Sequence, residues 1–212
     1  MKNKALVNVI ASGAISIGES ISLEQTRKLA LLVKELIHWN RQINLTSIRN
    51  IDGIVDLHIL DSMVIRSFLN GSRILDVGTG AGFPGLPLAI IEPDIYFELI
   101  DSNGKKIGFV NHIINELDLK NAVGVKSRSE NYIPAEGFDT LIARALSNIC
   151  NFISIAGHLV KSDGVMLALK GKRPNKELEQ IPTDWKHRVI ELQVPYLKTG
   201  SRHLIELKQR VY

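Results

Sequence analysis

The chain has 212 residues, a hydrophobic content of 45% and a formal net charge of +4, which suits one globular domain with an extension and a real core. Its single cysteine, Cys150, excludes an intramolecular disulfide framework and a zinc cluster of several thiolates, and it favours a reducing, cytoplasmic setting. No apolar run approaches membrane-spanning length, and the histidines lack metal-ligand spacing, so we expect neither a membrane span nor a bound metal.

The first 70 residues have the periodicity of helices. Ser22 and Gln25 form a capping box in front of a leucine-rich stripe at helical spacing, and a second apolar helix follows before Gly71. We therefore expect an N-terminal helical extension over residues 1–70, packed on a second domain over residues 71–212.

Beyond Gly71 the pattern alternates between strands and helices. We expect strands at 73–77, 95–100, 122–125, 138–143, 164–169, 188–194 and 203–209, with helices at 84–91, 104–117, 129–132 and 147–158. Such alternation implies a parallel sheet with helices on both faces. The turn around Pro195 and Gly200 predicts a terminal hairpin that supplies one antiparallel edge strand. The expected fold is therefore an α/β, doubly wound, seven-stranded and mostly parallel sheet.

A glycine-rich turn, Asp-Val-Gly-Thr-Gly-Ala-Gly-Phe-Pro-Gly at residues 76–85, joins the first of these strands to its helix. Glycines permit positive φ and close approach of a ligand, and the free N–H groups of the helix start form an electropositive rim. From Gly80 the turn matches the G-x-G-x-x-G fingerprint of NAD enzymes, whereas from Gly78 it resembles the first motif of S-adenosylmethionine-dependent methyltransferases. Asp101, at the end of the second strand, would bind an adenosine ribose in either case. Asp76 favours the methyl donor, because a carboxylate suits a cationic sulfonium and repels a pyrophosphate.

The last quarter of the chain is rich in basic side chains. Its densest cluster consists of Lys161, Lys170, Lys172, Arg173 and Lys176. A basic face attracts phosphate chains, which indicates a nucleic-acid partner. A solvated lysine-rich loop explains the cluster equally well.

A series of short motifs runs through most of the chain in a characteristic order. They are Trp39-Asn40, Ile43-Asn44-Leu45-Thr46, His58-Ile59-Leu60-Asp61-Ser62, the turn from Leu75 to Gly85, Asp101-Ser102, Lys105-Lys106, Ser127-Arg128, Glu130, Phe138-Asp139, Ala143-Arg144-Ala145, Leu169-Lys170-Gly171 and Arg202-His203. Together they resemble the glucose-inhibited division protein B (RsmG) family, bacterial methyltransferases that make 7-methylguanosine in small-subunit ribosomal RNA. The chain departs from the family at Leu57, where an arginine is usual.

The resemblance implies a Rossmann-like class I methyltransferase that uses S-adenosylmethionine, with 16S ribosomal RNA or the ribosomal subunit as partner. We expect it to act in the cytoplasm as a monomer. By similarity, Gly78, Gly80, Phe83 and Asp101 would hold the cofactor, and Ser129 and Glu130 would flank its adenine. The candidate RNA contacts are Lys105, Arg128, Lys170 and Arg202.

Arg144, after the fourth strand, is the candidate catalytic residue and would also contact the cofactor. It would act by positioning, because guanine N7 carries a free lone pair and needs no general base. An ion pair with Asp139 is the structural alternative. We expect His58 to form a buried pair with Asp61. The segment at 39–46, Thr46 included, is expected to fix a turn, with substrate contact as the alternative.

Other functions remain open at this point. The overlapping glycine fingerprint allows an NAD-dependent oxidoreductase. A non-catalytic RNA-binding assembly factor and a small-molecule methyltransferase also fit the sequence.

Overall fold

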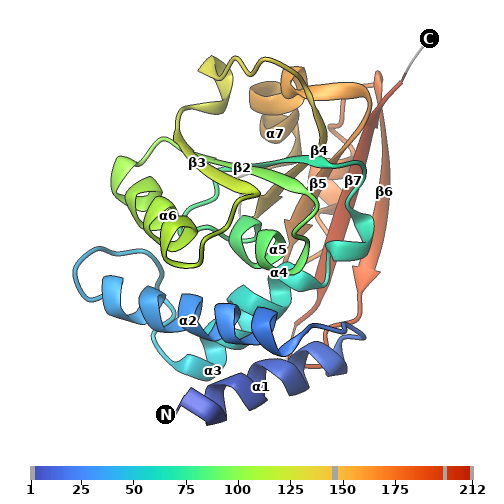
Figure 1. Cartoon of the computed structure of the whole chain (residues 1–212). Helices are drawn as coiled ribbons and strands as arrows, with labels where there is room; N and C mark the ends of the chain where they lie inside the picture. The colour runs from blue at the N-terminus through green and yellow to red at the C-terminus, as the bar shows by residue number, and fades with distance from the viewer. Residues whose placement is uncertain (1–2, 145–147, 198–199, 211–212) are drawn as a thin grey trace.

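The computed structural model describes residues 3–144, 148–197 and 200–210. Its strands are β1 (Arg73–Val77), β2 (Tyr96–Asp101), β3 (Ala122–Lys126), β4 (Phe138–Arg144), β5 (Val160–Lys170), β6 (Trp185–Leu192) and β7 (Arg202–Gln209). They form one seven-stranded sheet in the order β3-β2-β1-β4-β5-β7-β6 (Figure 1). The strands from β3 to β5 are parallel neighbours, and only the pairs made by β7 are antiparallel. The predicted doubly wound, mostly parallel sheet is confirmed.

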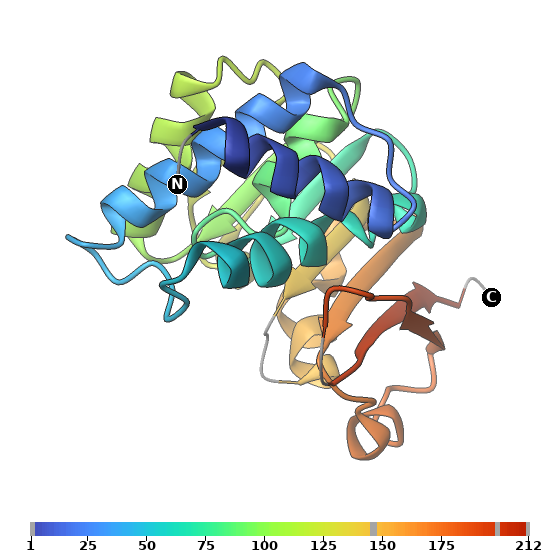
Figure 2. The ribbon, with the colours of Figure 1, turned by 90° about the horizontal axis from the view of Figure 1, so that it is seen from below.

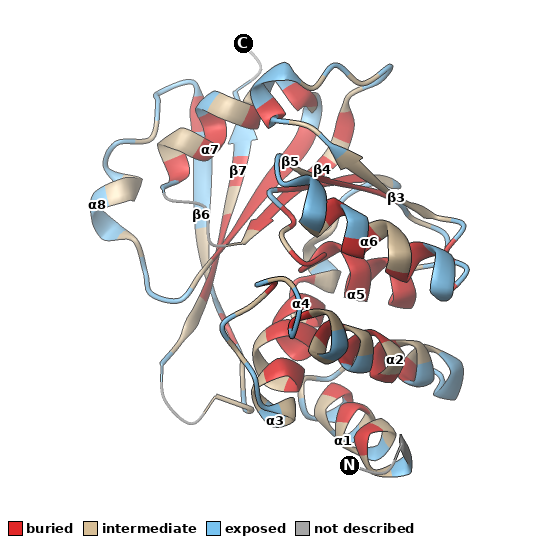
Figure 3. Cartoon of the chain, turned by 90° about the vertical axis from the view of Figure 1, so that its left-hand side faces the viewer, coloured by how far each residue is buried: buried red, intermediate tan, exposed pale blue. Residues whose placement is uncertain are grey.

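The position predicted for the antiparallel strand is wrong. We expected an antiparallel strand at the edge, but β7 lies between β5 and β6, and β6 forms the edge. Leu204, Ile205 and Leu207 of β7 are buried, whereas most residues of β6 are exposed or half-buried (Figure 3). The interior strand β7 thus buries its apolar side chains, whereas the edge strand β6 carries mostly exposed or half-buried ones, as edge strands commonly do.

Helices cover the sheet on both faces. They are α1 (Asn3–Ser16), α2 (Leu23–Trp39), α3 (Ile51–Ile54), the π-helix η1 (Val55–Leu60), α4 (Asp61–Met63), α5 (Gly85–Ile91), α6 (Gly104–Glu116), α7 (Ile149–Ala156) and α8 (Asn175–Leu178). Short 3₁₀ turns lie at η2 (Arg66–Phe68), η3 (Ser129–Asn131) and η4 (Gly157–Leu159). The predicted capping box is present, since Ser22 caps α2 and Gln25 returns the hydrogen bond. None of the described helices has the length and apolar character that crossing a bilayer requires.

Two buried clusters lie on opposite faces of the sheet. Successive residues of a strand point to opposite sides, so Ile74 joins the cluster beneath the N-terminal helices while Leu75 joins the cluster beneath α7. Figure 2 shows α1 and α2 lying across the first of these faces. The helices before Gly71 thus share one core with β1, β2 and β4. A domain boundary near residue 70 stays a prediction.

Candidate functional site

The glycine-rich turn leaves β1 at Val77 and enters α5 at Gly85. Gly78, Gly80 and Gly82 have φ angles of 68°, 61° and 86°, in the left-handed region that favours glycine. A Cβ on Gly80 would meet only the carbonyl oxygen of Gly78, at 4.0 Å. The turn therefore keeps open space beside Gly80, as a ligand-binding loop requires.

Asp76 lies beneath this turn and holds it in shape. Its carboxylate is fully buried, and Oδ2 accepts hydrogen bonds from Thr79 Oγ1 at 2.6 Å and from Gly85 N at 2.8 Å. The other oxygen, Oδ1, has no partner among the described residues. Burial raises the pKa of Asp76 to about 6, although both hydrogen bonds oppose the shift. The carboxylate is thus fixed beneath the loop, where its hydrogen bonds hold both ends of the turn.

One cavity, of about 220 Å³, opens on the β2 side of the turn; we call it the Asp101 cavity. Its lining includes the predicted residues Gly78, Asp101, Arg128, Ser129 and Glu130. The Asp101 carboxylate accepts hydrogen bonds from Gly80 N at 3.0 Å and from the backbone N–H of residue 103 at 2.8 Å. The ends of β1, β2 and β3 therefore bring together side chains that lie about fifty residues apart in sequence.

The segment after β3 contributes a hydrogen-bonded pair to this cavity. Ser129 is buried and its hydroxyl donates to Glu130 Oε2 at 3.1 Å. The pKa of Glu130 is held below its ordinary value by the N–H of its own backbone and by Ser129. Glu130 therefore presents an ionised acceptor at the cavity.

A second cavity, of about 360 Å³, lies on the β4 side of the turn; we call it the Arg144 cavity. It shares Gly78 with the Asp101 cavity. Its lining residues are Leu45, Thr46, Ser47, His58, Gly78, Thr79, Gly80, Ala81, Phe83, Lys106 and Arg144. The two cavities together can receive an elongated ligand that passes over Gly78.

Arg144, the last residue of β4, is fixed by the N-terminal helical region. Its guanidinium donates from Nη1 to the carbonyl oxygen of Leu57 at 2.7 Å and from Nη2 to His58 Nδ1 at 3.0 Å. The guanidinium carbon lies 5.5 Å from the ring centroid of Phe83. The alternative ion pair with Asp139 is absent, because Asp139 pairs with Lys161 at 2.7 Å.

His58 connects Arg144 to Thr46. Its ring stacks on Phe83 with centroids 4.7 Å apart, and its Nε2 lies 2.8 Å from Thr46 Oγ1. Burial first, and then the charge of Arg144, lowers the pKa of His58 to about 4, so the ring is neutral at pH 7. The pair predicted between His58 and Asp61 is wrong: the His58 side chain bonds Thr46 and Arg144 instead.

The candidate RNA contacts fall into two classes. Lys105 and Arg128 are exposed, and the described residues provide no ion pair for either side chain. Lys170 instead pairs with Glu177 at 2.9 Å. Arg202 Nε donates to both carboxylate oxygens of a buried acid in α4, at 2.8 and 2.9 Å. The structure therefore gives Lys170 and Arg202 partners within the chain, in contrast to the first two.

The acid that binds Arg202 is Asp61, which also accepts a hydrogen bond from the Tyr196 hydroxyl at 2.8 Å. Asp61 is only 3% exposed. This cluster ties the loop of the β6–β7 hairpin to the helices before the sheet.

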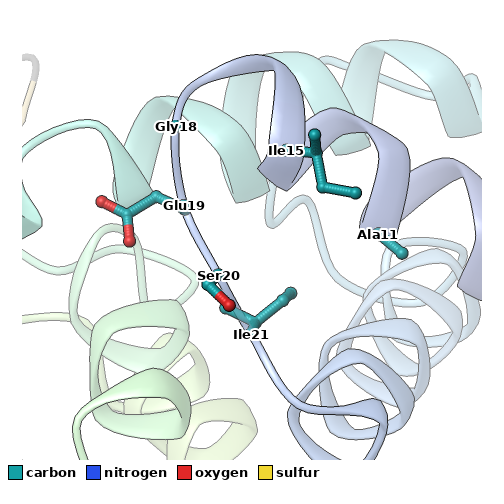
Figure 4. Close-up of a pocket in the computed structure, with 6 residues that line it drawn as sticks. All are labelled: Ala11, Ile15, Gly18, Glu19, Ser20 and Ile21. Carbon is teal, nitrogen blue, oxygen red and sulfur yellow. The ribbon is translucent and has the colours of Figure 1, made fainter.

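Two of the hollows that lie away from the turn are lined in part by α1. One, of about 350 Å³, is enclosed by the end of α1 and the linker to α2 (Figure 4). Its charged side chain, Glu19, is paired with Arg66 at 2.8 Å. The other, of about 630 Å³, lies between α1 and α2. Neither shares a lining residue with the two cavities at Gly78, and the described residues contain no group of side chains suited to a metal ion.

Sequence reasoning did not group Thr46 and Lys106 with the site. Thr46 reaches it because Asn40 Oδ1 accepts from the N–H groups of Leu45 and Thr46, at 2.8 and 3.0 Å, which fixes the predicted turn. Lys106 reaches the Arg144 cavity from α6, and its Nζ lies 4.0 Å from Asp101 Oδ2. The Asn-Leu-Thr motif at residues 44–46 is the sequence feature that could have identified Thr46 as a residue of the site.

Known proteins match this chain in both sequence and fold. A family model described as rRNA small subunit methyltransferase G matches residues 25–205. Ribosomal RNA small subunit methyltransferase G of Aeromonas hydrophila is 47% identical over 193 residues, 90% of this chain and 89% of the relative. The Nitrosococcus oceani protein of the same name is 41% identical, over 96% of this chain and 95% of its own.

Solved structures agree on the fold. A SAM-dependent methyltransferase from Aquifex aeolicus superposes with a TM-score of 0.53 at 21% identity, covering 73% of this chain and 92% of its own. TrmN from Thermus thermophilus gives a TM-score of 0.57 at 17% identity, covering 71% of this chain and 48% of its own. At such identities the likeness concerns the sheet and its helices alone.

Proposed function

The chain belongs to the ribosomal RNA small subunit methyltransferase G family, and on that premise we propose that it transfers a methyl group from S-adenosylmethionine to N7 of a guanine in 16S ribosomal RNA. The observation that carries the proposal is the pair of cavities that meet at Gly78. One holds acceptors suited to an adenosine, and the other holds a fixed guanidinium suited to the reacting end.

The residues at the turn fit a positively charged methyl donor. Asp101 would accept hydrogen bonds from the ribose hydroxyls, and the segment with Ser129 and Glu130 would border the adenine. Asp76 has a buried carboxylate oxygen without a partner among the described residues, which a nearby positive charge would stabilise. The same carboxylate would repel the pyrophosphate of a dinucleotide. The donor, when bound, supplies an electrophilic methyl group on a cationic sulfur.

The side chains around the Arg144 cavity support catalysis by positioning. Guanine N7 has a lone pair and no proton to remove, so the reaction needs no general base. His58 is unsuited to that role in any case, because its Nδ1 accepts from Arg144 and its pKa lies near 4. Arg144 would orient the base, its phosphate or the carboxylate of the donor with the N–H groups that Leu57 and His58 leave free.

Methyl transfer to unmodified small-subunit RNA by the purified protein tests this function. Mass spectrometry of the digested product is expected to find one 7-methylguanosine per RNA, and only with S-adenosylmethionine present. If the protein transfers no methyl group to RNA or to subunit particles, the remaining interpretation is a non-catalytic RNA-binding factor. If the product is a different methylated nucleoside, the N7 assignment is overturned.

Calorimetry tests whether the protein binds the methyl donor or a dinucleotide. We expect S-adenosylmethionine to bind and NADH not to bind, and Asp101→Ala to weaken donor binding about tenfold or more while the fold is retained. Binding of NADH alone would favour an oxidoreductase.

We include in the proposal that the enzyme is monomeric and cytoplasmic, and that its RNA contacts include Lys105 and Arg128.

A further inference from the structure

The Thr46 hydroxyl occupies a defined place at the mouth of the Arg144 cavity. It lines this cavity together with Gly80, Phe83 and Arg144. The turn that carries it is fixed by the Asn40 side chain, whose Nδ2 also donates to the Thr46 carbonyl oxygen at 2.9 Å. Thr46 is therefore held by the scaffold as part of the wall of the cavity that a substrate base would enter.

The direction of the hydrogen bonds around Thr46 follows from Arg144. A guanidinium has donors and no acceptor, so His58 Nδ1, at 3.0 Å from Nη2, must carry the lone pair. In a neutral imidazole the proton is then on Nε2, which lies 2.8 Å from Thr46 Oγ1 and donates to it. The backbone N–H of Ile48 donates to the same oxygen at 3.2 Å.

Both acceptor positions of the Thr46 hydroxyl are thereby occupied. Its remaining function is that of a donor, because a hydroxyl has one proton and two lone pairs. Among the residues that the structure describes, none accepts this proton. A half-buried hydroxyl with one unused donor at a cavity wall favours an acceptor on the incoming molecule.

We propose that Thr46 is a specificity-determining residue whose hydroxyl donates a hydrogen bond to O6 of the target guanine. This inference rests on the proposed methylation of guanine N7. The major-groove edge of guanine carries two acceptors, N7 and O6. N7 must keep its lone pair for the methyl group, which leaves O6 for the hydroxyl.

This arrangement also explains how adenine would be rejected. Adenine has N7 in the same place, but it carries an N6 amino group where guanine has O6. A hydroxyl that can only donate would face a donor and be left without a partner. Sites that reject a substrate through an unpaired polar group discriminate strongly.

A pair of variants tests the role of the hydroxyl. Thr46→Val keeps the shape of the side chain and removes the hydroxyl, and Thr46→Ser keeps the hydroxyl. On unmodified 16S RNA we expect Thr46→Val to lower kcat/KM about tenfold, the effect of one neutral hydrogen bond, and Thr46→Ser to stay within about twofold of the wild type. The affinity of both variants for S-adenosylmethionine should match the wild type. An equal loss in both variants would overturn the proposal.

A base analogue separates recognition from support of the fold. The methylated nucleotide is located by mass spectrometry with the wild type, and RNA is assembled with 2-aminopurine, which has N7 and lacks O6, at that position. We expect wild type and Thr46→Val to be equally active on this RNA. If the valine variant is again tenfold slower, Thr46 acts only through the fold and the proposal fails.

The activities of the wild type and of Thr46→Val on guanine together separate this inference from the proposed function. If it methylates guanine N7 and Thr46→Val is unimpaired on guanine, this inference fails while the proposed function stands. If the wild type forms no 7-methylguanosine, the proposed function fails and this inference fails with it.

Discussion

The two cavities that meet at Gly78 are built in different ways. The Asp101 cavity is formed by the carboxyl ends of neighbouring parallel strands and by the segment that follows β3. The Arg144 cavity joins the end of β4 to segments that precede the sheet in sequence. The first uses features that any sheet of this kind offers, since ligands bind at the carboxyl ends of its strands. The second depends on the helices of this chain.

The two cavities also differ in how firmly their side chains are held in place. At the Asp101 cavity, Glu130 and Arg128 are exposed and can move to meet a ligand. At the Arg144 cavity, a chain of hydrogen bonds runs from the Leu57 carbonyl through Arg144 and His58 to Thr46. Preorganised donors of this kind favour precise orientation. We infer that the Asp101 cavity serves cofactor affinity, whereas the Arg144 cavity serves turnover and choice of base.

Arg144→Ala is expected to have the largest effect. Loss of a preorganised donor should lower kcat/KM about a hundredfold to a thousandfold. The Leu57 carbonyl and His58 would also lose a partner, at about 1–3 kcal/mol of stability and about 2–12 °C in melting temperature. Steady-state methylation assays and thermal denaturation measure the two effects.

Arg144→Lys is the matched control. It keeps the positive charge but cannot bond Leu57 and His58 with one planar group, so only part of the activity should return. Full activity in the lysine variant would show that charge alone suffices. A melting temperature that falls without loss of turnover would make Arg144 a structural residue.

Arg202→Met is expected to affect folding and leave the site intact. The sequence suggested Arg202 as an RNA contact, but it pairs with buried Asp61, and removing it leaves that carboxylate with the Tyr196 hydroxyl but without its cation. Breaking a buried ion pair costs about 3 kcal/mol, or about 6–12 °C in melting temperature. Adding Asp61→Asn should recover part of that loss, and RNA affinity measured by filter binding should stay at the wild-type level. A large loss of RNA affinity with normal stability would restore the RNA interpretation.

Local patterns in the sequence were sufficient for much of the fold and for the Asp101 cavity. The strand at 73–77, the capping box and the glycine turn depend on neighbouring residues, and all three were predicted correctly. Asp101 could be placed because the ends of parallel strands meet at one edge of the sheet. It lines the cavity beside Gly78 as expected.

Contacts between distant segments could not be predicted in the same way. Arg144 meets His58 across 86 positions, and Arg202 meets Asp61 across 141. The insertion of β7 between β5 and β6 likewise pairs β5 with a strand that is not its neighbour in sequence. Such pairings follow from packing of whole elements, for which the sequence carries no local signal.

The pH dependence of Asp76 tests whether the buried charge beneath the turn serves the cofactor. Its folded-state pKa of about 6 lies above the ordinary value of 3.8, so the folded chain holds this proton more tightly than the unfolded chain does. The stability that this group contributes is therefore present at low pH and is lost as the pH rises from about 4 to 6, by about 3 kcal/mol. Over the same rise, affinity for the cationic donor should increase as the carboxylate ionises.

Asp76→Asn is the control for this prediction. The amide does not ionise, so denaturation and calorimetry at pH 4–8 should show both trends flattened relative to the wild type. If the differences in unfolding free energy and in donor affinity between the wild type and Asp76→Asn stay constant from pH 4 to 8, the raised pKa of Asp76 is contradicted.

Lys105→Ala and Arg128→Gln are expected to have the smallest effects, and these are measured on RNA binding. Both side chains are exposed, and each would contribute about one phosphate contact. Each change should weaken RNA binding several-fold and reduce the slope of log affinity against log salt by about 0.7–1. Lys120, which is exposed and precedes β3 at the opposite end of the sheet, provides the control, because Lys120→Ala should leave the slope unchanged. Equal slopes for all variants and the wild type would mean that RNA reaches the Arg144 cavity over another surface.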